Sequence, residues 1–428
     1  MVKIIKMGIL ACLIPLLWLP ATSLAQSPKN LSLKMLLDST LANYPLHKKE
    51  PLFEQQWQLQ TQQVDKQNLP QLELNGKASY QNEVIDIGAV MPGFAGPELS
   101  KDQYRFSLDI KQSIYKGNFT RKQKELYGAQ KDASLKQLEI EQHALKAKVV
   151  ELFFGLQFND NQQQILRTYR TQLESKIAEF EALLRNGSLL QSSLDGLLLE
   201  KLKINQQFTE IENDRVKLVK NLSEISGLAM DTATVFILDE PAVSLAENQQ
   251  RPEYQLMELN QQQINTGKKL LDVKYQPMLY AFGSAGYGRP GFNMLSDDFA
   301  DFYMIGIGLN WKLWDWQQGK HDKQLYELNA DIIEVQKETF LKGLQTSLNS
   351  FEQEMLKLQS LIASDQDIVD MQNRIALTAE NQLQNGVITS SQYVEELEKV
   401  QQYQLQLVTR KLQLNLTKIN YLWALGLL

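Results

Sequence analysis

The chain has 428 residues, of which 43% are hydrophobic and 22% charged. Its mean hydropathy of −0.32 excludes a polytopic helical membrane protein. Lys and Arg number 44 against 50 Asp and Glu, so there is no basic excess with which to hold nucleic acid. Twelve prolines and 22 glycines are few for this length, which disfavours a disordered chain.

The N-terminus has the order of features of a secretory signal. Lys3 and Lys6 precede an apolar run from Met7 to Leu19, which is too short to span a bilayer as a helix. Ser23-Leu24-Ala25 then supplies small residues at a cleavage site. The sequence predicts a signal peptide over residues 1–25, and therefore export.

The chain has one cysteine, Cys12, and it would leave with this peptide. A lipid anchor at Cys12 is disfavoured because most of the apolar stretch follows it. The mature chain is therefore expected to have neither a disulfide framework nor a thiolate metal site.

The mature chain repeats itself. At one constant offset, the sequence pairs Pro45 with Pro252 and Gly76 with Gly283. The loop that follows is shorter in the second copy. Beyond it, at a smaller offset, Asn186-Gly187 pairs with Asn385-Gly386. The predicted organisation is a first repeat over 26–228, a linker over 229–250 and a second repeat over 251–428. Each repeat is expected to run helix, strand, loop, strand, long helix, turn, helix.

Four segments have the alternation of half-buried strands, with apolar residues at every second position. They are residues 71–81, 104–115, 278–288 and 303–314. The third is less regular because Tyr280 and Phe282 fall on the polar side. The polar side of the sheet carries both signs of charge, which indicates no obvious selectivity: Glu73, Lys77, Arg105, Asp109 and Lys111.

These strands have the length, about ten to twelve residues, that crosses a bilayer when tilted. Aromatic residues mark both ends of the strands and predict a barrel belt: Tyr80, Tyr104, Tyr287 and Tyr303 beside the loops, and Tyr115, Trp311 and Trp314 at the other end. An ordinary antiparallel sheet with one solvated face has the same alternation. The export signal and the long flanking helices favour the membrane interpretation.

The predicted helices are unusually long. From about Thr120 to Arg185 there is no proline, which corresponds to a rod of about 100 Å. Apolar residues in this segment follow alternating steps of three and four, as in a coiled coil. The predicted seams are Leu166, Tyr169, Leu173, Ile177, Phe180 and Leu184; then Ile204, Phe208, Ile211, Leu218, Leu222 and Ile225; and in the second repeat Leu405, Val408, Leu412, Leu416, Ile419 and Trp423.

Four strands are too few to close a barrel, since small barrels need about eight. In lipid an open sheet edge leaves unpaired backbone groups, so other copies of the chain must complete the sheet. A dimer would give eight strands and a trimer twelve, and physical reasoning alone leaves the two open.

Several features together resemble the TolC-like outer membrane efflux proteins. They are the signal peptide, the tandem repeat, the helix starts at Asn43-Tyr44-Pro45 and Arg251-Pro252-Glu253, the strand exit at Leu313-Trp314-Asp315, and the paired Asn-Gly hairpins. The resemblance implies a mainly helical protomer with four transmembrane strands, which trimerises into a 12-stranded outer membrane barrel and a periplasmic helical tunnel. It also implies a passive exit duct that docks through its helical tips to a periplasmic adaptor and, through it, to an inner-membrane transporter.

The same resemblance indicates where the pore would be narrowest. In the family, two aspartates three residues apart line the constriction, beginning six residues after the glycine of the second hairpin. The corresponding residues here are Gln392 and Glu395, so the first acid is missing and the second is replaced by its longer homologue. Glu395 would place three carboxylates near the axis of a trimer, unless it is simply a solvated helix residue.

The hairpin segments 186–193 and 385–392 are the predicted adaptor-docking sites, although Asn-Gly also suits a plain helical reversal. The candidate docking residues are Asn186, Gly187, Leu189, Asn385, Gly386 and Ile388.

Catalysis is not supported by any motif. His47, His143 and His321 are isolated, and no phosphate loop, nucleophile motif or metal cluster appears, so we expect no cofactor. The carboxylates of Asp297, Asp298 and Asp301 are more simply explained as solvated loop residues than as a cation site. The main alternative to a duct is a periplasmic coiled-coil scaffold without a channel; an exported enzyme and a self-standing porin are disfavoured.

Overall fold

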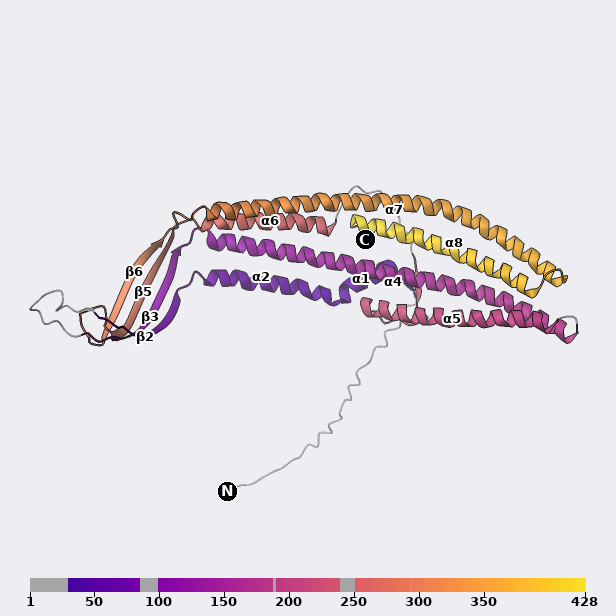
Figure 1. Ribbon diagram of the computed structural model, residues 1–428, viewed down its shortest axis with the longest axis horizontal. Coiled ribbons are helices and arrows are strands. Elements are labelled where there is room, and N and C mark those ends of the chain that lie inside the picture. The colour runs from indigo at the N-terminus through magenta and orange to yellow at the C-terminus, as the bar shows by residue number, and fades with distance from the viewer. Residues whose placement is uncertain (1–29, 85–98, 188–189, 239–250, 294) are drawn as a thin grey trace, which may run out of the picture.

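The computed structural model describes residues 30–84, 99–187, 190–238, 251–293 and 295–428. The molecule is elongated, with a β-sheet at one end and long helices running side by side away from it (Figure 1). The predicted signal peptide, Leu189 and most of the predicted linker lie outside the described residues. The division into two repeats stays a prediction, and the elements described below follow the expected order in both halves.

The main sheet has four antiparallel strands in the order β2-β3-β5-β6. Their bounds are Gln71–Tyr80 for β2, Asp102–Tyr115 for β3, Met278–Arg289 for β5 and Ala300–Asn310 for β6. The first three strands agree with the predicted segments to within two residues at each end. In the part of the chain that the structure describes, each edge strand, β2 and β6, has a single partner.

The predicted fourth strand, 303–314, was wrong at both ends. The strand begins three residues earlier, at Ala300, and ends at Asn310. The reason lies in its partner: Asn310 pairs with Met278, the first residue of β5, so the residues that follow have no strand to pair with. Trp311 and Trp314 therefore follow the sheet, and Trp311 Nε1 donates a hydrogen bond of 3.1 Å to the backbone of Tyr275.

The helices repeat in length between the two halves. The long helices α4 (Phe119–Arg185) and α7 (Gln318–Gln384) each have 67 residues, and the return helices α5 (Gln191–Ser226) and α8 (Ser390–Leu425) each have 36. The helices that lead into the sheet are α2 (Lys49–Lys66) and α6 (Pro252–Val273). A rod of 67 residues is about 100 Å long, as predicted.

Several short elements pack against α4 and α5 near the middle of the rod. The helix α1 (Leu33–Asn43) and the short 3-10 helix η1 (Pro45–Lys48) precede α2, and β1 (Asn30–Ser32) pairs in parallel with β4 (Val235–Ile237). One hydrophobic cluster joins β1, α1 and β4 to α4 and to the last turns of α5. Phe153, Leu31 and Leu36 are fully buried in it.

A second cluster fills the coiled coils near the hairpins and confirms the predicted seam of the first repeat as far as Ile211. Leu166, Leu173 and Ile204 are at most 1% exposed there. Of the remaining predicted positions, Leu222 is buried in the first cluster, and Leu218 and Ile225 are half-buried against it. The predicted stripe on α8 was only partly right: Ile419 is buried, whereas Leu405, Val408 and Leu412 are half-buried. The side chains that α8 buries most include Tyr393, Leu397, Leu407, Tyr421 and Leu425, because α8 packs on α4 and α5 as well as on α7.

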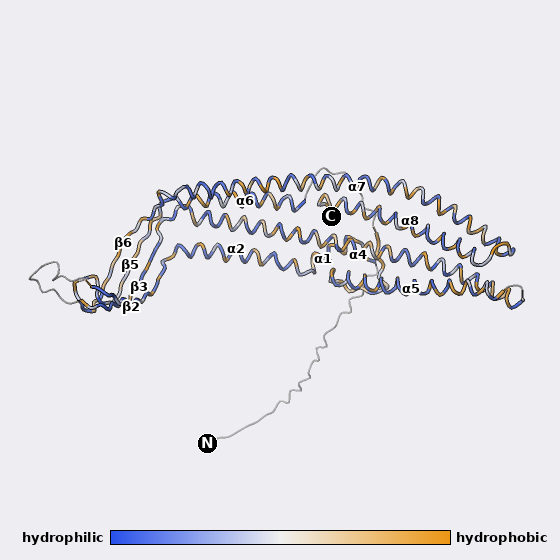
Figure 2. The backbone as a smooth tube through the Cα atoms, in the orientation of Figure 1, coloured by the Kyte–Doolittle hydropathy of each residue, from blue (hydrophilic) through white to orange (hydrophobic). Residues whose placement is uncertain are grey.

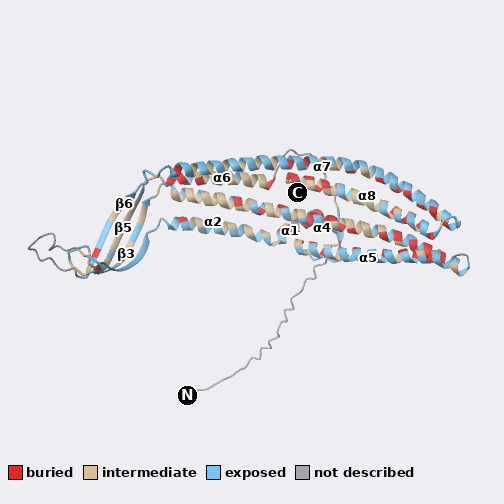
Figure 3. Cartoon of the chain, viewed as in Figure 1, coloured by how far each residue is buried: buried red, intermediate tan, exposed pale blue. Residues whose placement is uncertain are grey.

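Hydrophobic residues recur along the whole length of the chain rather than gathering in one centre (Figure 2). Buried residues are concentrated along the inner lines of helix contact and are nearly absent from the sheet (Figure 3). A single layer of helices and strands cannot cover both of its faces, so a large apolar area remains exposed.

Candidate functional site

The sheet has one apolar face and one polar face, and the strand register fixes which residues share each. Leu74 pairs with Leu108, Leu108 with Ala285, and Ala285 with Tyr303. The apolar face is exposed throughout: Leu72 is 64% exposed, Ile305 84% and Ile307 71%. Such a continuous, uncovered apolar face indicates contact with lipid or another chain.

The aromatic residues predicted as a belt lie at opposite ends of this face. Tyr104 and Tyr287 both stack on Phe299 at the loop end, with ring centroids 6.1 Å and 5.6 Å apart. Tyr80 and Tyr303 lie at the same end and are 76% and 79% exposed. Tyr115, the last residue of β3, lies at the other end, where Trp311 and Trp314 follow β6. Their role as a membrane belt stays a prediction.

The polar face explains the irregular third strand. Phe282 pairs with Gly306 and Tyr280 with Gly308, so each ring covers a residue without a side chain on the neighbouring strand. A Cβ atom at Gly308 would lie 2.3 Å from the Tyr280 ring, and one at Gly306 would lie 2.6 Å from the Phe282 ring. Lys111 Nζ lies 4.5 Å from the centre of the Tyr280 ring. The aromatic rings thus belong to the polar face, as the alternation indicated.

A hydrogen-bonded turn joins the sheet to α7. Asp315 accepts a hydrogen bond of 2.6 Å from Tyr275 Oη and one of 2.7 Å from the backbone N–H of Gly319. These bonds, first that from Tyr275, lower the pKa of Asp315. Trp316 and Gln317 adopt the left-handed conformation, with φ of 55° and 66°. The Leu313-Trp314-Asp315 motif therefore forms the junction at which strand becomes helix.

The two hairpins at the far end of the rod are built alike. Gly187 and Gly386 have φ of 70° and 69° and directly follow Asn186 and Asn385, the last capping residues of α4 and α7. The left-handed conformation is the one that favours glycine, and this explains the Asn-Gly pair at each tip. The predicted helical reversals are confirmed at both sites.

The side chain of Gln392 takes part in capping the N-terminus of α8. Thr389 Oγ1 accepts a hydrogen bond of 3.3 Å from the backbone of Gln392, and Gln392 Oε1 accepts one of 2.9 Å from the backbone of Thr389. This reciprocal capping box satisfies two backbone donors at the helix start. The glutamine at this position therefore has a capping role within the hairpin.

Glu395 lies one turn further along α8, and its side chain is 63% exposed. Its carboxylate lies 2.9 Å from Lys399 Nζ, which also contacts Glu396 at 2.8 Å. Ile388, Gln392 and Glu395 line one shallow groove of about 510 Å³ between α7 and α8. The structure therefore brings the constriction candidates and one docking candidate together, at the tip of the second hairpin.

Polar contacts that the sequence did not single out link the two hairpins. Tyr169 on α4 donates a hydrogen bond of 3.2 Å to Glu200 on α5, and Lys203 lies 2.9 Å from Glu200 and 3.7 Å from Glu398 on α8. Glu200 is 5% exposed. Burial, followed by the charge of Glu200, raises the pKa of Tyr169 and of Glu398. Heptad spacing finds apolar seams, so it gave no signal for these polar contacts.

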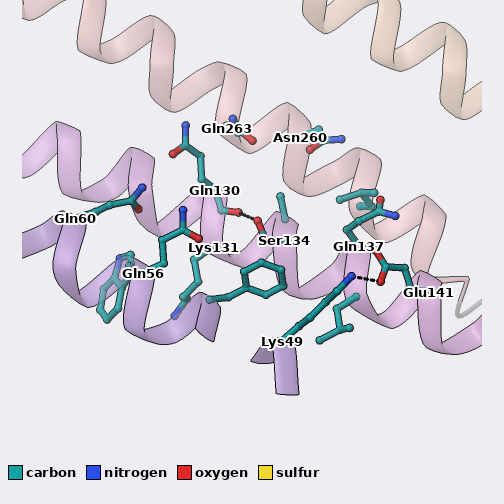
Figure 4. Close-up of a pocket in the computed structure, with 15 residues that line it drawn as sticks. Lys49, Gln56, Gln60, Gln130, Lys131, Ser134, Gln137, Glu141, Asn260 and Gln263 are labelled. Atoms are coloured by element: carbon teal, nitrogen blue, oxygen red, sulfur yellow. Dashed lines mark hydrogen bonds and ion pairs between the residues drawn. The ribbon is translucent and has the colours of Figure 1, made fainter. Parts of the chain in front are cut away.

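In the half of the rod nearer the sheet, a groove of about 510 Å³ lies between α2, α4 and α6 (Figure 4). Amide side chains dominate its lining, among them Gln60, Gln130 and Asn260. The ion pair of Lys49 and Glu141 crosses it at 2.5 Å. These residues make the wall of the groove predominantly polar.

In the described part of the chain, no group of three or more His, Cys, Asp or Glu residues is placed to hold a metal ion. Asp297 accepts hydrogen bonds of 2.7 Å and 2.6 Å from the backbone N–H and the hydroxyl of Ser100, so its oxygens tie two loops together.

Among the described helices, none has an apolar stretch long enough to cross a membrane.

The sequence matches no model of a known protein family and no curated protein. Solved structures match over nearly the whole chain. The chain is similar to the transmembrane channel CusC, with a TM-score of 0.70 and 13% identity over 92% of this chain and 91% of that one. It is also similar to the CmeC outer membrane channel of Campylobacter jejuni, with a TM-score of 0.67, 16% identity and coverage of 92% and 85%.

The MtrE outer membrane channel of Neisseria gonorrhoeae matches with a TM-score of 0.64, 13% identity and coverage of 92% and 88%. At these identities the likeness establishes the fold. It agrees with the four-stranded sheet, the paired long helices and the twin hairpins described above. The chain therefore has the fold of the TolC-family outer membrane channels.

Proposed function

We propose that the chain is the outer membrane exit duct of an efflux system, working as a homotrimer that passively conducts substrates outward. The observation that carries this proposal is the sheet: one face is apolar and exposed, and neither edge strand has a second partner among the described residues. A sheet with these properties is stable in lipid only when other copies close it.

Strand direction supports closure into a ring. The four strands alternate in direction, so β6 of one copy and β2 of the next would meet antiparallel. Three copies would give a barrel of twelve strands, wide enough for an aqueous lumen, whereas two copies would give eight strands and a nearly filled one. A conducting channel therefore favours the trimer.

The helical rod carries matching apolar edges. Close to the sheet, α7 exposes Leu325, Leu328, Ile332 and Val335, and α2 at the opposite edge exposes Leu52 and Leu59. Close to the hairpins, α7 exposes Ile368, Met371 and Ile375, and α5 exposes Leu199 and Leu202. Each pair of stripes lies at about the same height along the rod, at 1.5 Å per residue. We infer that α7 of one copy packs on α2 and α5 of the next, which closes the tunnel below the barrel.

The hairpin tips are the proposed contact with a periplasmic adaptor, which in turn would connect to an inner-membrane transporter. They lie at the end of the rod farthest from the sheet (Figure 1). Leu190, three residues after Gly187, is 74% exposed, and Val387, directly after Gly386, is 69% exposed. Exposed apolar residues at both tips suit a docking surface better than a free end in water. Glu395, in the groove beside Ile388, is the proposed constriction residue.

The duct is tested with the purified full-length protein in detergent and in planar bilayers. We expect a trimeric mass, a heat-sensitive shift in gel migration that reports β-barrel content, and ion conductance. A monomer that stays in water without detergent would exclude the duct. The alternative, a coiled-coil scaffold, predicts no conductance and no membrane-inserted β-structure.

Docking is tested by photo-crosslinking to a co-expressed adaptor from Ile388 and from Leu189. The matched control is Leu356, which is equally apolar, 60% exposed and on α7 away from the tip. Adduct formation from the tip positions alone supports docking. Equal adducts from Leu356 would indicate lateral association instead.

A further inference from the structure

On the polar face of the sheet, acidic and basic residues lie at different distances from the loop end. We call the pair of Glu73 and Asp109 the acidic level, and the pair of Lys77 and Arg105, nearer the loops, the basic level. Glu73 pairs directly with Asp109, and four residues nearer the loops Lys77 pairs directly with Arg105. Two like-charged pairs therefore face each other across the same two strands. Directly opposed like charges destabilise a sheet, so this arrangement works against folding.

The acidic level is held by hydrogen bonds. Asp109 accepts bonds from Asn75 at 2.6 Å and from Ser107 at 3.0 Å, as well as from Ser284 on β5. These donors engage the carboxylate of Asp109, so it forms no ion pair with Lys77 or Arg105 at the basic level.

The basic level lies in a pocket at the loop end of the sheet. The pocket has a volume of about 340 Å³, and its lining includes Lys77, Arg105, Arg289 and Asp297. Arg289 is paired with Asp102, and Asp297 accepts both of its hydrogen bonds from Ser100. Within the described residues, Lys77 and Arg105 are thus the lining cations without a carboxylate partner.

The guanidinium of Arg105 is positioned by aromatic rings rather than by an acid. Its Cζ atom lies 4.5 Å from the centre of the Phe302 ring and 5.5 Å from that of Phe292. Contacts with ring faces orient the guanidinium and leave its N–H donors available. A fixed guanidinium beside an exposed ammonium is suited to oxyanions, which accept several hydrogen bonds at once.

We propose that Lys77 and Arg105 form an anion-binding site at the outer mouth of the duct, which takes phosphate or carboxylate groups. The proposal rests on the proposed function, because that function makes the polar face the lumen. In a trimer the site would recur three times and form a basic ring above an acidic one, and such rings of charge set the ion preference of a pore.

The test is single-channel recording with inorganic phosphate added to one side at constant ionic strength. We expect phosphate at the loop side to reduce the wild-type current more strongly than phosphate at the helical side. The double variant Lys77→Gln/Arg105→Gln should weaken this block about tenfold, the effect expected for two partly exposed charge-assisted contacts. Citrate in place of phosphate shows whether carboxylates bind as well, as the proposal requires.

The matched control is Lys101→Gln, which removes a charge at the same end of the sheet from a residue outside the pocket lining. It should leave the block unchanged. Lys77→Glu, provided that the variant still forms the heat-sensitive trimer, should abolish the anion block, because the new carboxylate would pair with Arg105 directly opposite. Equal block in the wild type and the double variant, or stronger block from the helical side, would overturn the site. A protein with no conductance at all would instead refute the duct.

Discussion

Lys176 Nζ on α4 lies 2.8 Å from Glu380 on α7 and 2.8 Å from Glu179 on its own helix, so one ammonium joins the two hairpins. Its side chain is only 5% exposed. Burial disfavours the charged ammonium, but the hydrogen bonds to Glu179 and Glu380 outweigh burial and raise the pKa of Lys176. The lysine therefore stays protonated and holds the hairpins together over the physiological pH range.

Replacing this lysine, Lys176→Gln, should lower the free energy of unfolding by about 1–3 kcal/mol, because two carboxylates lose their shared partner in a largely buried site. Thermal unfolding followed by helical circular dichroism measures the effect. The control is Lys201→Gln, which breaks the exposed pair with Glu174 at 3.2 Å and should cost less than about 1 kcal/mol. Equal losses would show that Lys176 does not link the hairpins.

The contact between α5 and α8 should strengthen in mild acid. Glu398 faces Glu200 and Lys203 on α5 and lies near Tyr169 on α4. Burial, then the charge of Glu200, raises the pKa of Glu398 above 4.5. The folded state thus binds this proton more tightly than the unfolded state, and stability contributed by the site rises as the pH falls from neutral toward 4.5. Glu398→Gln should be more stable than wild type at neutral pH and lose this rise.

The neighbouring Glu396 supplies a control of opposite sign. Hydrogen bonds from Lys399 and then from Gln372 lower its pKa below 4.5. Its stabilisation is present above pH 4.5 and is lost as the pH falls through the lowered pKa. Glu396→Gln should therefore be less stable than wild type at neutral pH and show a smaller loss in strong acid. Melting curves of Glu396→Gln and Glu398→Gln, recorded from neutral pH to strong acid, measure both effects. If the two variants responded alike to pH, both assignments would be contradicted.

Removing the charge of Glu395 tests the constriction. Glu395→Gln should raise single-channel conductance or weaken block by Mg²⁺ about twofold or more, because three carboxylates near one axis would be neutralised. Glu354→Gln is the matched control, since Glu354 also pairs with a lysine on an exposed helical surface, Lys357, at 2.5 Å. Unchanged values for Glu395→Gln would leave it a solvated helix residue.

The ring-over-glycine packing of the polar face should be sensitive to a single methyl group. Gly308→Ala places a Cβ atom 2.3 Å from the Tyr280 ring, so the ring must move and its contact with Lys111 is lost. We expect a cost of about 1–3 kcal/mol. It is measured as a lower temperature at which the heat-sensitive oligomer dissociates.

Gly76→Ala is the control for this substitution, because its Cβ atom would meet Phe106 at an ordinary 3.7 Å. This variant should dissociate close to the wild-type temperature. A larger effect at Gly76 than at Gly308 would show that strand glycines act through the backbone rather than through the aromatic cover.

Periodicity predicted most of the architecture. Alternation located the strands because each has one apolar face, and steps of three and four located the seam from Leu166 to Phe180. Alternation failed beyond Asn310 because Trp311 and Leu313 continue the pattern of apolar residues at every second position after the partner strand has ended. A strand's end depends on its neighbour, which a single segment does not contain.

The candidate site was harder to predict than the fold. The turn chemistry of Asn385-Gly386 is local, and it was visible in the sequence. The hydrogen bonds that engage Gln392 are also local, since Thr389 and Gln392 have the spacing of a capping box. The links of Lys176 to Glu380 and of Lys203 to Glu398 join residues far apart in the chain, and only the packing of the helices brings them together.

The equal lengths of the two helical hairpins, 67 and 36 residues in each half, place Asn186 and Asn385 at the same depth. A closed ring of three chains would then end in six tips of almost the same shape, although it has only threefold symmetry. A partner with six identical subunits would meet a nearly equivalent binding site at every position. The two kinds of tip differ in side chains such as Leu190 and Val387. These differences would distinguish alternate binding sites and so fix the rotational position of the partner on the ring.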